Sequence, residues 1–288
     1  MTEIEQLNIE SEVVFGKIPF FAFEGVGGSG KSHIIRSLEL EMAQAGFITA
    51  NYKISGMGAG ERNEILRRIK EHQTDLISTG GASEKQIQDV QKDRIFMLGM
   101  KYQMRKMVTE TRDRSDLQLI LLDRTPLMPW VYSISTNANN PFLNDILGKG
   151  IEYSRQLQID TQYLFDVSPE TAYARMIARM CTNTPDSKEV IAKVCKQINA
   201  PSDSSEIIRD KTLQLLAENH NIIPKSAENY CFISFETLAN ERKYFLQAGN
   251  IINKECGTRL MIINAELHPE EITHTISRDI ESRIVQKI

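Results

Sequence analysis

Short apolar segments alternate along this chain with stretches whose apolar residues recur at helical spacing. Segments of this kind, apolar at successive positions, are typical of strands buried on both faces of a parallel sheet. The pattern predicts five strands, at 20–23, 47–54, 117–122, 163–167 and 259–264. Strands that alternate with helices predict an α/β fold, with a five-stranded parallel sheet sandwiched between two layers of helices.

The predicted helices carry their own start and stop signals. The first begins at Lys31 and stops at Gly46, and its apolar face consists of Ile34, Ile35, Leu38, Met42 and Ala45. A long helix is predicted from Glu84 to about Arg112, and we expect its methionine stripe to lie in the core. Two later helices begin at Pro169 and Pro269, each followed by acidic residues in the first turn.

The region 181–231 interrupts the alternation of strands and helices. It is polar, has turn-forming segments at 182–187 and 201–205, and shows two helical patterns between and after them. This length is too short for an independent core, so we interpret the region as a helical insertion. The chain is therefore predicted to be one domain over 1–288, with its core at about 17–180 and 232–288.

Composition narrows the function classes. A formal net charge of −4 over 288 residues argues against bulk binding to nucleic acid. No apolar run reaches the roughly 18 residues that a membrane span needs, and the first residues are acidic where a secretory signal is basic. The cysteines show no C-x-x-C pairing and the histidines are scattered, so we expect no zinc or histidine-based metal site. These features predict a cytoplasmic protein.

The strongest motif follows the first predicted strand. Gly25 to Ser32 reads G-V-G-G-S-G-K-S and is followed at once by a helical pattern, which is the Walker A motif in the setting it requires. Its glycines allow backbone N–H groups to point at one phosphate chain, and the helix adds the positive end of its dipole. The predicted nucleotide-binding residues are Gly25, Gly27, Gly28, Ser29, Gly30, Lys31, Ser32 and His33.

Two residues of this motif have distinct predicted roles. Lys31 can reach the β- and γ-phosphates, and the Ser32 hydroxyl is placed to bind Mg²⁺. The third strand ends in Asp123-Arg124, at the edge of a parallel sheet that also holds the glycine-rich loop. No N-K-x-D signature is present, which argues against a GTPase, and no strand ends in the paired acids of a motor ATPase.

Further motifs resemble those of thymidylate kinases and the related deoxynucleoside kinases. The shared segments are F-E-G at 23–25, D-R at 123–124, 163–170 followed by Arg175 and Arg179, F-E at 235–236 and 260–272. They occur in the family's order and cover most of the chain outside the insertion. The resemblance implies a P-loop NTPase fold, in which the insertion is a helical lid.

The resemblance also implies an activity. A kinase of this group uses ATP and Mg²⁺ to phosphorylate a nucleoside monophosphate such as dTMP, or a deoxynucleoside. The resemblance also suggests a homodimer. Lys31, Asp123, Arg124, Arg175 and Arg179 are then the catalytic residues, and Ser32 and Asp123 the metal-binding ones. Arg124 would clamp a phosphate, Asp123 would hold Mg²⁺ through water or act as a base, and the later arginines would belong to the lid.

Departures from the family leave the acceptor open. The acidic residue of the family's loop is Gly27 here, Lys53 and the segment 55–60 replace its arginine-containing loop, and Thr125-Pro126 follows Asp123-Arg124. Two alternatives therefore stand beside a nucleotide kinase. One is a kinase of another small metabolite, and the other is a catalytically weak ATP-binding module whose insertion is an interaction surface. Asp123 and Arg124 could also form a structural ion pair.

Overall fold

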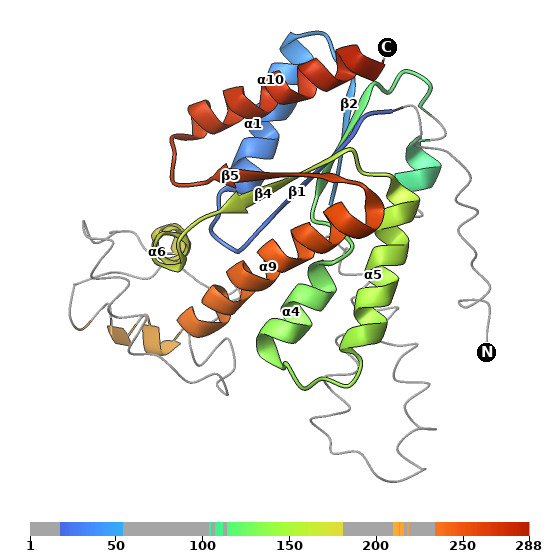
Figure 1. Cartoon of the computed structure of the whole chain (residues 1–288). Coiled ribbons are helices and arrows are strands. Elements are labelled where there is room, and N and C mark those ends of the chain that lie inside the picture. The colour runs from blue at the N-terminus through green and yellow to red at the C-terminus, as the bar shows by residue number, and fades with distance from the viewer. Residues whose placement is uncertain are drawn as a thin grey trace.

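The computed structural model describes residues 18–53, 104, 107–111, 114–180, 210–212, 214–215, 218 and 234–287. Within these residues the chain forms an α/β structure (Figure 1). The strands are β1 (Phe20–Gly25), β2 (Thr49–Lys53), β3 (Leu119–Asp123), β4 (Thr161–Asp166) and β5 (Arg259–Asn264). The helices are α1 (Lys31–Gln44), α4 (Met128–Thr136), α5 (Leu143–Leu157), α6 (Pro169–Met180), α9 (Phe235–Cys256) and α10 (Pro269–Lys287).

The five strands form one parallel sheet in the order β2-β3-β1-β4-β5. Helices α1 and α10 cover one face, and α4, α5 and α9 lie on the other (Figure 1). β1 and β3 are buried at every position, because both faces of the central strands are covered. In the register of β1 with β3, Phe23 lies opposite Asp123, so the residues that follow each strand emerge side by side.

Local sequence signals set the helix ends. The Ser234 hydroxyl caps α9 by accepting a hydrogen bond from Thr237 N at 3.0 Å, and Gly257 ends this helix with a φ of 71°. Ser168 caps α6 in the same way, through Thr171 N at 3.2 Å. Pro169 then occupies the first helical position, where its missing N–H costs no hydrogen bond.

The structure confirms the α/β class and the five-stranded parallel sheet. β2 begins at Thr49 rather than at residue 47, and Ile48 is exposed. On α1 the predicted apolar face is buried except at Ala45, which is exposed beyond the last turn. Met104 and Met107 are buried in the apolar core, as predicted for the methionine stripe. Trp130 is buried there as well.

Helices α4, α5 and α9 were not predicted. α4 is apolar on nearly all sides and carries serines and a threonine, so it has no clear helical period. Its hydroxyl groups bond back to the preceding turn, as Ser135 Oγ does to Val131 O at 2.6 Å. A buried helix of this kind is formed by tertiary packing, here against α5 and α9, rather than by its own pattern.

Several predictions lie outside the described residues. These are the loop at 55–60, most of the long helix at 84–112 and almost all of the insertion at 181–231. Single positions between 210 and 218 are helical, in agreement with the second helical pattern of the insertion. No helix of the described residues is long and apolar enough to cross a membrane.

Candidate functional site

A pocket of about 270 Å³ opens at the carboxyl ends of β1 and β3. This is where an open parallel sheet with helices on both faces binds its ligands. The loop between β1 and α1 forms one wall, and the ends of β2 and β3 and the start of α4 form the other. The lining residues are Val26, Gly27, Gly28, Ser29, Gly30, Lys31, Ser32, Lys53, Asp123, Arg124, Met128 and Tyr132.

The loop backbone has a shape that ordinary residues do not adopt easily. Gly28 and Gly30 have φ angles of 80° and 88°, in the left-handed region. A Cβ on Gly28 would lie 2.2 Å from the carbonyl oxygen of Ala172, so the loop packs against α6 through the missing side chain. Gly27 is different, because its φ is not in this region and its Cβ would meet only Met176 Sδ, at 3.5 Å. We expected Gly27, like Gly25, Gly28 and Gly30, to take a backbone conformation that is closed to residues with a Cβ, and this expectation is wrong at Gly27.

The loop leaves donors available at the pocket. Within the described residues, the backbone N–H groups of Gly28, Gly30, Lys31 and Ser32 have no hydrogen-bond acceptor. Two of these belong to the first turn of α1, where N–H groups have no partner inside the helix. Several N–H groups and a helix N-terminus at one pocket wall form a concave surface of positive potential that suits a phosphate chain.

Lys31 projects into the pocket and is 7% exposed. Its Nζ lies 3.9 Å from Asp123 Oδ1. Burial, and to a smaller extent the neighbouring Arg124, lower the pKa of Lys31 to about 7, although Asp123 and Glu24 act in the opposite direction. A lysine whose charged form is destabilised in the free protein is stabilised strongly by an anion that binds next to it.

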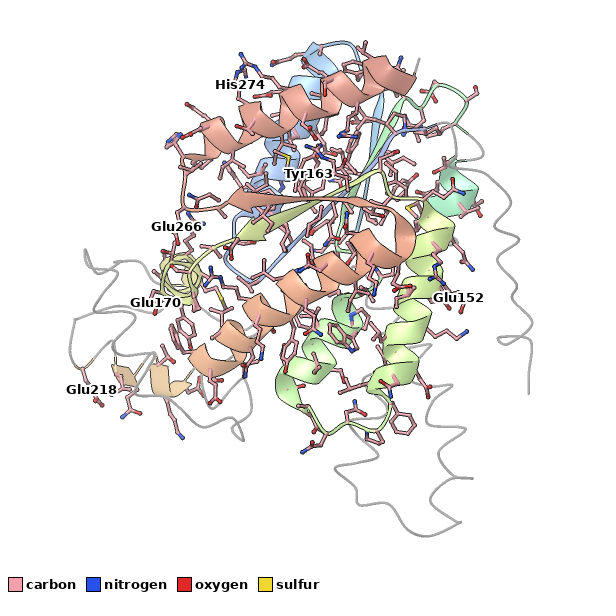
Figure 2. The ribbon with its side chains drawn as sticks, viewed as in Figure 1. Glu152, Tyr163, Glu170, Glu218, Glu266 and His274 are labelled. Atoms are coloured by element: carbon pink, nitrogen blue, oxygen red, sulfur yellow. The ribbon has the colours of Figure 1, made fainter. Side chains whose placement is uncertain are left out.

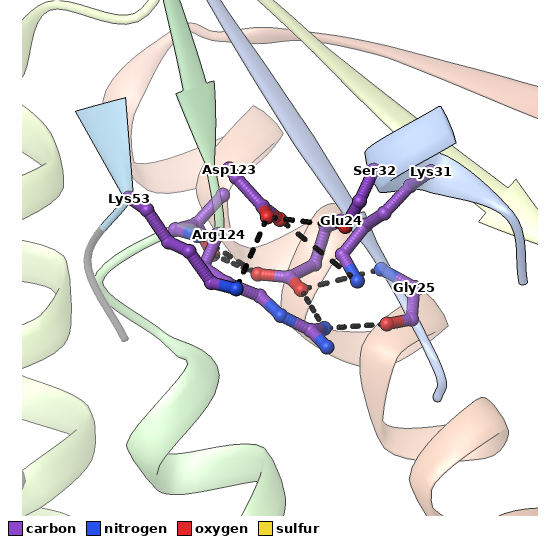
Figure 3. Close-up of polar contacts among 8 residues, drawn as sticks. Glu24, Gly25, Lys31, Ser32, Lys53, Asp123 and Arg124 are labelled. Carbon is purple, nitrogen blue, oxygen red and sulfur yellow. Dashed lines mark hydrogen bonds and ion pairs between the residues drawn. The ribbon is translucent and has the colours of Figure 1, made fainter. Parts of the chain in front are cut away.

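Asp123 lies at the centre of the polar contacts (Figure 3). Its Oδ2 accepts a hydrogen bond from Ser32 Oγ at 3.4 Å and lies 3.8 Å from Lys53 Nζ. Its Oδ1 is buried and has no hydrogen-bond partner in the described residues. A carboxylate oxygen that accepts no hydrogen bond, next to a hydroxyl group, provides the oxygen ligands that Mg²⁺ prefers, so Ser32 and Asp123 could hold this ion.

Arg124 does not pair with Asp123. Its Nη1 donates to Glu24 Oε1 at 2.7 Å and to the carbonyl oxygen of Gly25 (Figure 3). The guanidinium carbon lies 5.9 Å from the ring centre of Tyr132 and 5.7 Å from that of Phe245. Arg124 is thus held by one ion pair and two aromatic faces while it still lines the pocket.

The remaining predicted residues lie around this centre. Arg175 on α6 donates to Ser29 O at 3.4 Å and to Ala265 O at 2.9 Å, so it joins the glycine-rich loop to the turn after β5. Neither Gly25, with which the loop starts, nor the exposed His33 lines the pocket. The side chain of Arg179 lies outside the described residues.

Sequence reasoning missed Glu24, and it noted Lys53 without assigning it to the site. Glu24 is fully buried, and the available signal was a lone carboxylate at the end of an apolar strand, directly before the loop. Lys53 ends β2 and brings a half-exposed ammonium group to Asp123. Tyr132 was also missed, because α4 was not predicted.

A different polar cluster attaches α10 to the sheet. Asp279 accepts hydrogen bonds from Tyr163 at 2.8 Å and from Arg259 at 2.7 and 2.9 Å. Figure 2 shows Tyr163 between the sheet and α10. This cluster is not part of the pocket lining.

No protein-family model matches this chain, and no curated protein matches it either. Within the described residues there is also no group of three or more His, Cys, Asp or Glu side chains that could hold a metal ion by themselves.

Proposed function

We propose that this protein is a phosphotransferase of the P-loop kinase type, which uses ATP and Mg²⁺ to phosphorylate a small acceptor. One observation carries the proposal. Lys31, Ser32 and Asp123 converge on a pocket whose wall presents free backbone N–H groups at a helix N-terminus. This combination suits the phosphates of a nucleoside triphosphate.

The proposed roles follow from the contacts. The loop N–H groups and Lys31 hold the β- and γ-phosphates, and Ser32 and Asp123 hold Mg²⁺, which would neutralise charge on the phosphate oxygens. Arg124 and Lys53 are the further positive charges at the pocket. Phosphoryl transfer depends mainly on alignment and on positive charge around the transferred group, which these residues supply.

The acceptor is proposed to be a nucleoside monophosphate of the dTMP type or a deoxynucleoside, on the sequence resemblance described above. Two cations flank the side of the pocket nearest β2 and β3, Lys53 and Arg124, and they suit an acceptor that carries a phosphate. Asp123 would instead serve as the base for a hydroxyl acceptor. The helical lid and the homodimer that the resemblance implies remain predictions.

The experiment is ADP release from Mg-ATP with a panel of nucleosides and nucleoside monophosphates, with thymidine and dTMP first. Stimulation by a monophosphate supports a nucleotide kinase, and stimulation by a nucleoside assigns Asp123 as the base. Turnover only with acceptors that are not nucleotides would replace the nucleotide kinase with a kinase of another metabolite. Absence of ATP binding would contradict the proposal entirely.

A catalytically weak ATP-binding module is the second candidate. The pairing of Arg124 with Glu24 and Gly25 favours it, because an arginine engaged in this way has fewer donors left for a phosphate. Tight binding of Mg-ATP without release of ADP in the presence of any acceptor would support this candidate. Robust turnover with any acceptor would exclude it.

A further inference from the structure

Glu24 is a buried charged residue next to the pocket that no proposed step uses. It is the second-last residue of β1, is 0% exposed and has both carboxylate oxygens engaged. Oε1 accepts from Arg124 Nη1 at 2.7 Å and from Gly25 N at 3.2 Å. Oε2 accepts from Thr125 N at 2.8 Å and from Thr125 Oγ1 at 3.0 Å.

Three of these contacts, those to Arg124 and Thr125, join two segments that must be aligned for phosphoryl transfer. Gly25 starts the glycine-rich loop, and Arg124 and Thr125 follow Asp123 at the end of β3. The register of β1 and β3 brings the segments side by side, but strand pairing stops at Phe23 and Asp123. Beyond that point, Arg124 N still bonds to Phe23 O, and Glu24 supplies the side-chain contacts that join the two segments.

The backbone at this junction is strained. Arg124 has a φ of 89°, in the left-handed region that a residue with a side chain rarely adopts. Glu24 stabilises it from both sides, through the guanidinium of Arg124 and through the N–H of the next residue. Such conformations persist where surrounding contacts over-determine them, and they cluster at functional sites.

The charge of Glu24 is unfavourable for binding a triphosphate. A carboxylate directly beneath the loop repels phosphate oxygens and offsets part of the positive charge of Arg124. A residue that served nucleotide affinity alone would not be an acid at this position. Its contacts therefore point to alignment of the catalytic groups and not to affinity.

We propose that Glu24 is a positioning residue, which fixes the guanidinium of Arg124 and the spacing between the glycine-rich loop and Asp123. The inference rests on the proposed phosphotransferase function. Glu24 holds Nη1 of Arg124 against the loop, and the aromatic rings of Tyr132 and Phe245 limit the motion of the guanidinium. The rest of the side chain lines the pocket in one orientation.

The test is Glu24→Gln, which keeps the shape of the side chain but places an amide NH₂ against donors. We expect kcat to fall by about 100-fold, the order of loss that a misplacement of 1 Å causes, while KM for ATP stays equal or falls. Thr125→Val removes one of the four hydrogen bonds and keeps the volume. It is expected to lower kcat by roughly 3- to 10-fold with the same unchanged KM, and it serves if Glu24→Gln does not fold.

Asp279→Asn is the matched control, because it makes the same carboxylate-to-amide change in the cluster under α10. It should lower the melting temperature and leave kcat and KM within about twofold. Wild-type kcat in both Glu24→Gln and Thr125→Val would overturn the inference, as would a fall in kcat that is accompanied by a rise in KM for ATP and a lower melting temperature. A wild-type protein without transfer to any acceptor removes the proposed function and this inference with it, a result distinct from an active wild type beside an active Glu24→Gln.

Discussion

Two clusters of polar and charged residues lie on this sheet, and they differ in how completely their buried polar atoms are hydrogen-bonded. The pocket cluster consists of Glu24, Lys31, Lys53, Asp123 and Arg124, and the α10 cluster consists of Tyr163, Arg259 and Asp279. In the α10 cluster both oxygens of Asp279 accept short hydrogen bonds. In the pocket cluster a buried oxygen of Asp123 accepts no hydrogen bond from any residue that the structure describes, and Lys31 has a lowered pKa.

The difference separates a structural contact from a binding site. A satisfied cluster stabilises the fold and has little left to offer a ligand. An incompletely satisfied one costs stability in the free protein and recovers that free energy when a ligand completes it. Loss of the Lys31 charge should therefore lower activity without lowering stability, whereas loss of the Asp279 charge should lower stability without lowering activity.

Lys31→Met is expected to have the largest effect. Transfer should fall by about 1,000-fold or more, since the charge that follows the γ-phosphate is lost. Because the folded protein holds the Lys31 proton less tightly than the unfolded chain, burying the charge costs stability, in full below pH 7 and not at all above pH 10.5. The variant should therefore be more stable than the wild type at pH 6, by up to about 5 kcal/mol, in denaturant unfolding.

A Lys31→Met variant that is less stable than the wild type at pH 6 would contradict the conclusion that the charge of Lys31 is poorly compensated in the free protein.

Asp279→Asn should instead lower stability and leave transfer nearly unchanged in the same assays. Transfer should stay within about twofold, and the free energy of unfolding should fall by about 1–3 kcal/mol, the range for hydrogen bonds to a charged group. A loss of transfer in this variant without a loss of stability would contradict the assignment of the functional site to the pocket cluster.

The loop glycines offer a sharper comparison inside the pocket. Gly28→Ala should weaken Mg-ATP binding by about 100-fold, because its Cβ would lie 2.2 Å from the carbonyl oxygen of Ala172. Gly27→Ala should bind Mg-ATP within about twofold of the wild type, since its Cβ makes an ordinary contact. Isothermal titration of both variants measures the difference, and equal losses would contradict the loop geometry.

Proton uptake on nucleotide binding should be the smallest effect. Phosphate oxygens next to Lys31 raise its pKa above the value of about 7 in the free protein. Binding at pH 8 should then take up about 0.9 proton, and binding at pH 6 about 0.1 proton. Titrations in two buffers of different ionisation enthalpy measure this number. Equal uptake at the two pH values would show that Lys31 is not the group concerned.

The sheet was predictable because its strands are short, apolar and separated by helices with caps. The ends of β5 match the prediction, and α6 and α10 begin at their predicted prolines. Helix α4 was not predictable in the same way, because tertiary contacts form it, and the prediction also missed α5 and α9, although α9 has local signals at Ser234 and Gly257. Their absence from the prediction also hid Tyr132 and Phe245, the two rings beside Arg124.

The candidate site was predictable where a motif fixes both residue type and spacing. The sequence alone identified Lys31, Ser32, Asp123 and Arg124, and the structure brings them to one pocket. It could not identify the partner of Arg124, since Glu24 is 100 residues away and is paired with it only through strand register. Periodicity along one chain segment carries no information on register between strands that are distant in sequence.

The most direct test is isothermal titration of the wild type, Lys31→Met and Asp279→Asn with Mg-ATP, at pH 7. The account predicts binding by the wild type, comparable binding by Asp279→Asn and a loss of binding by Lys31→Met, all with folded protein. Binding that survives in Lys31→Met, or a wild type that does not bind Mg-ATP, would contradict the assignment of the pocket between β1 and β3 as the nucleotide site.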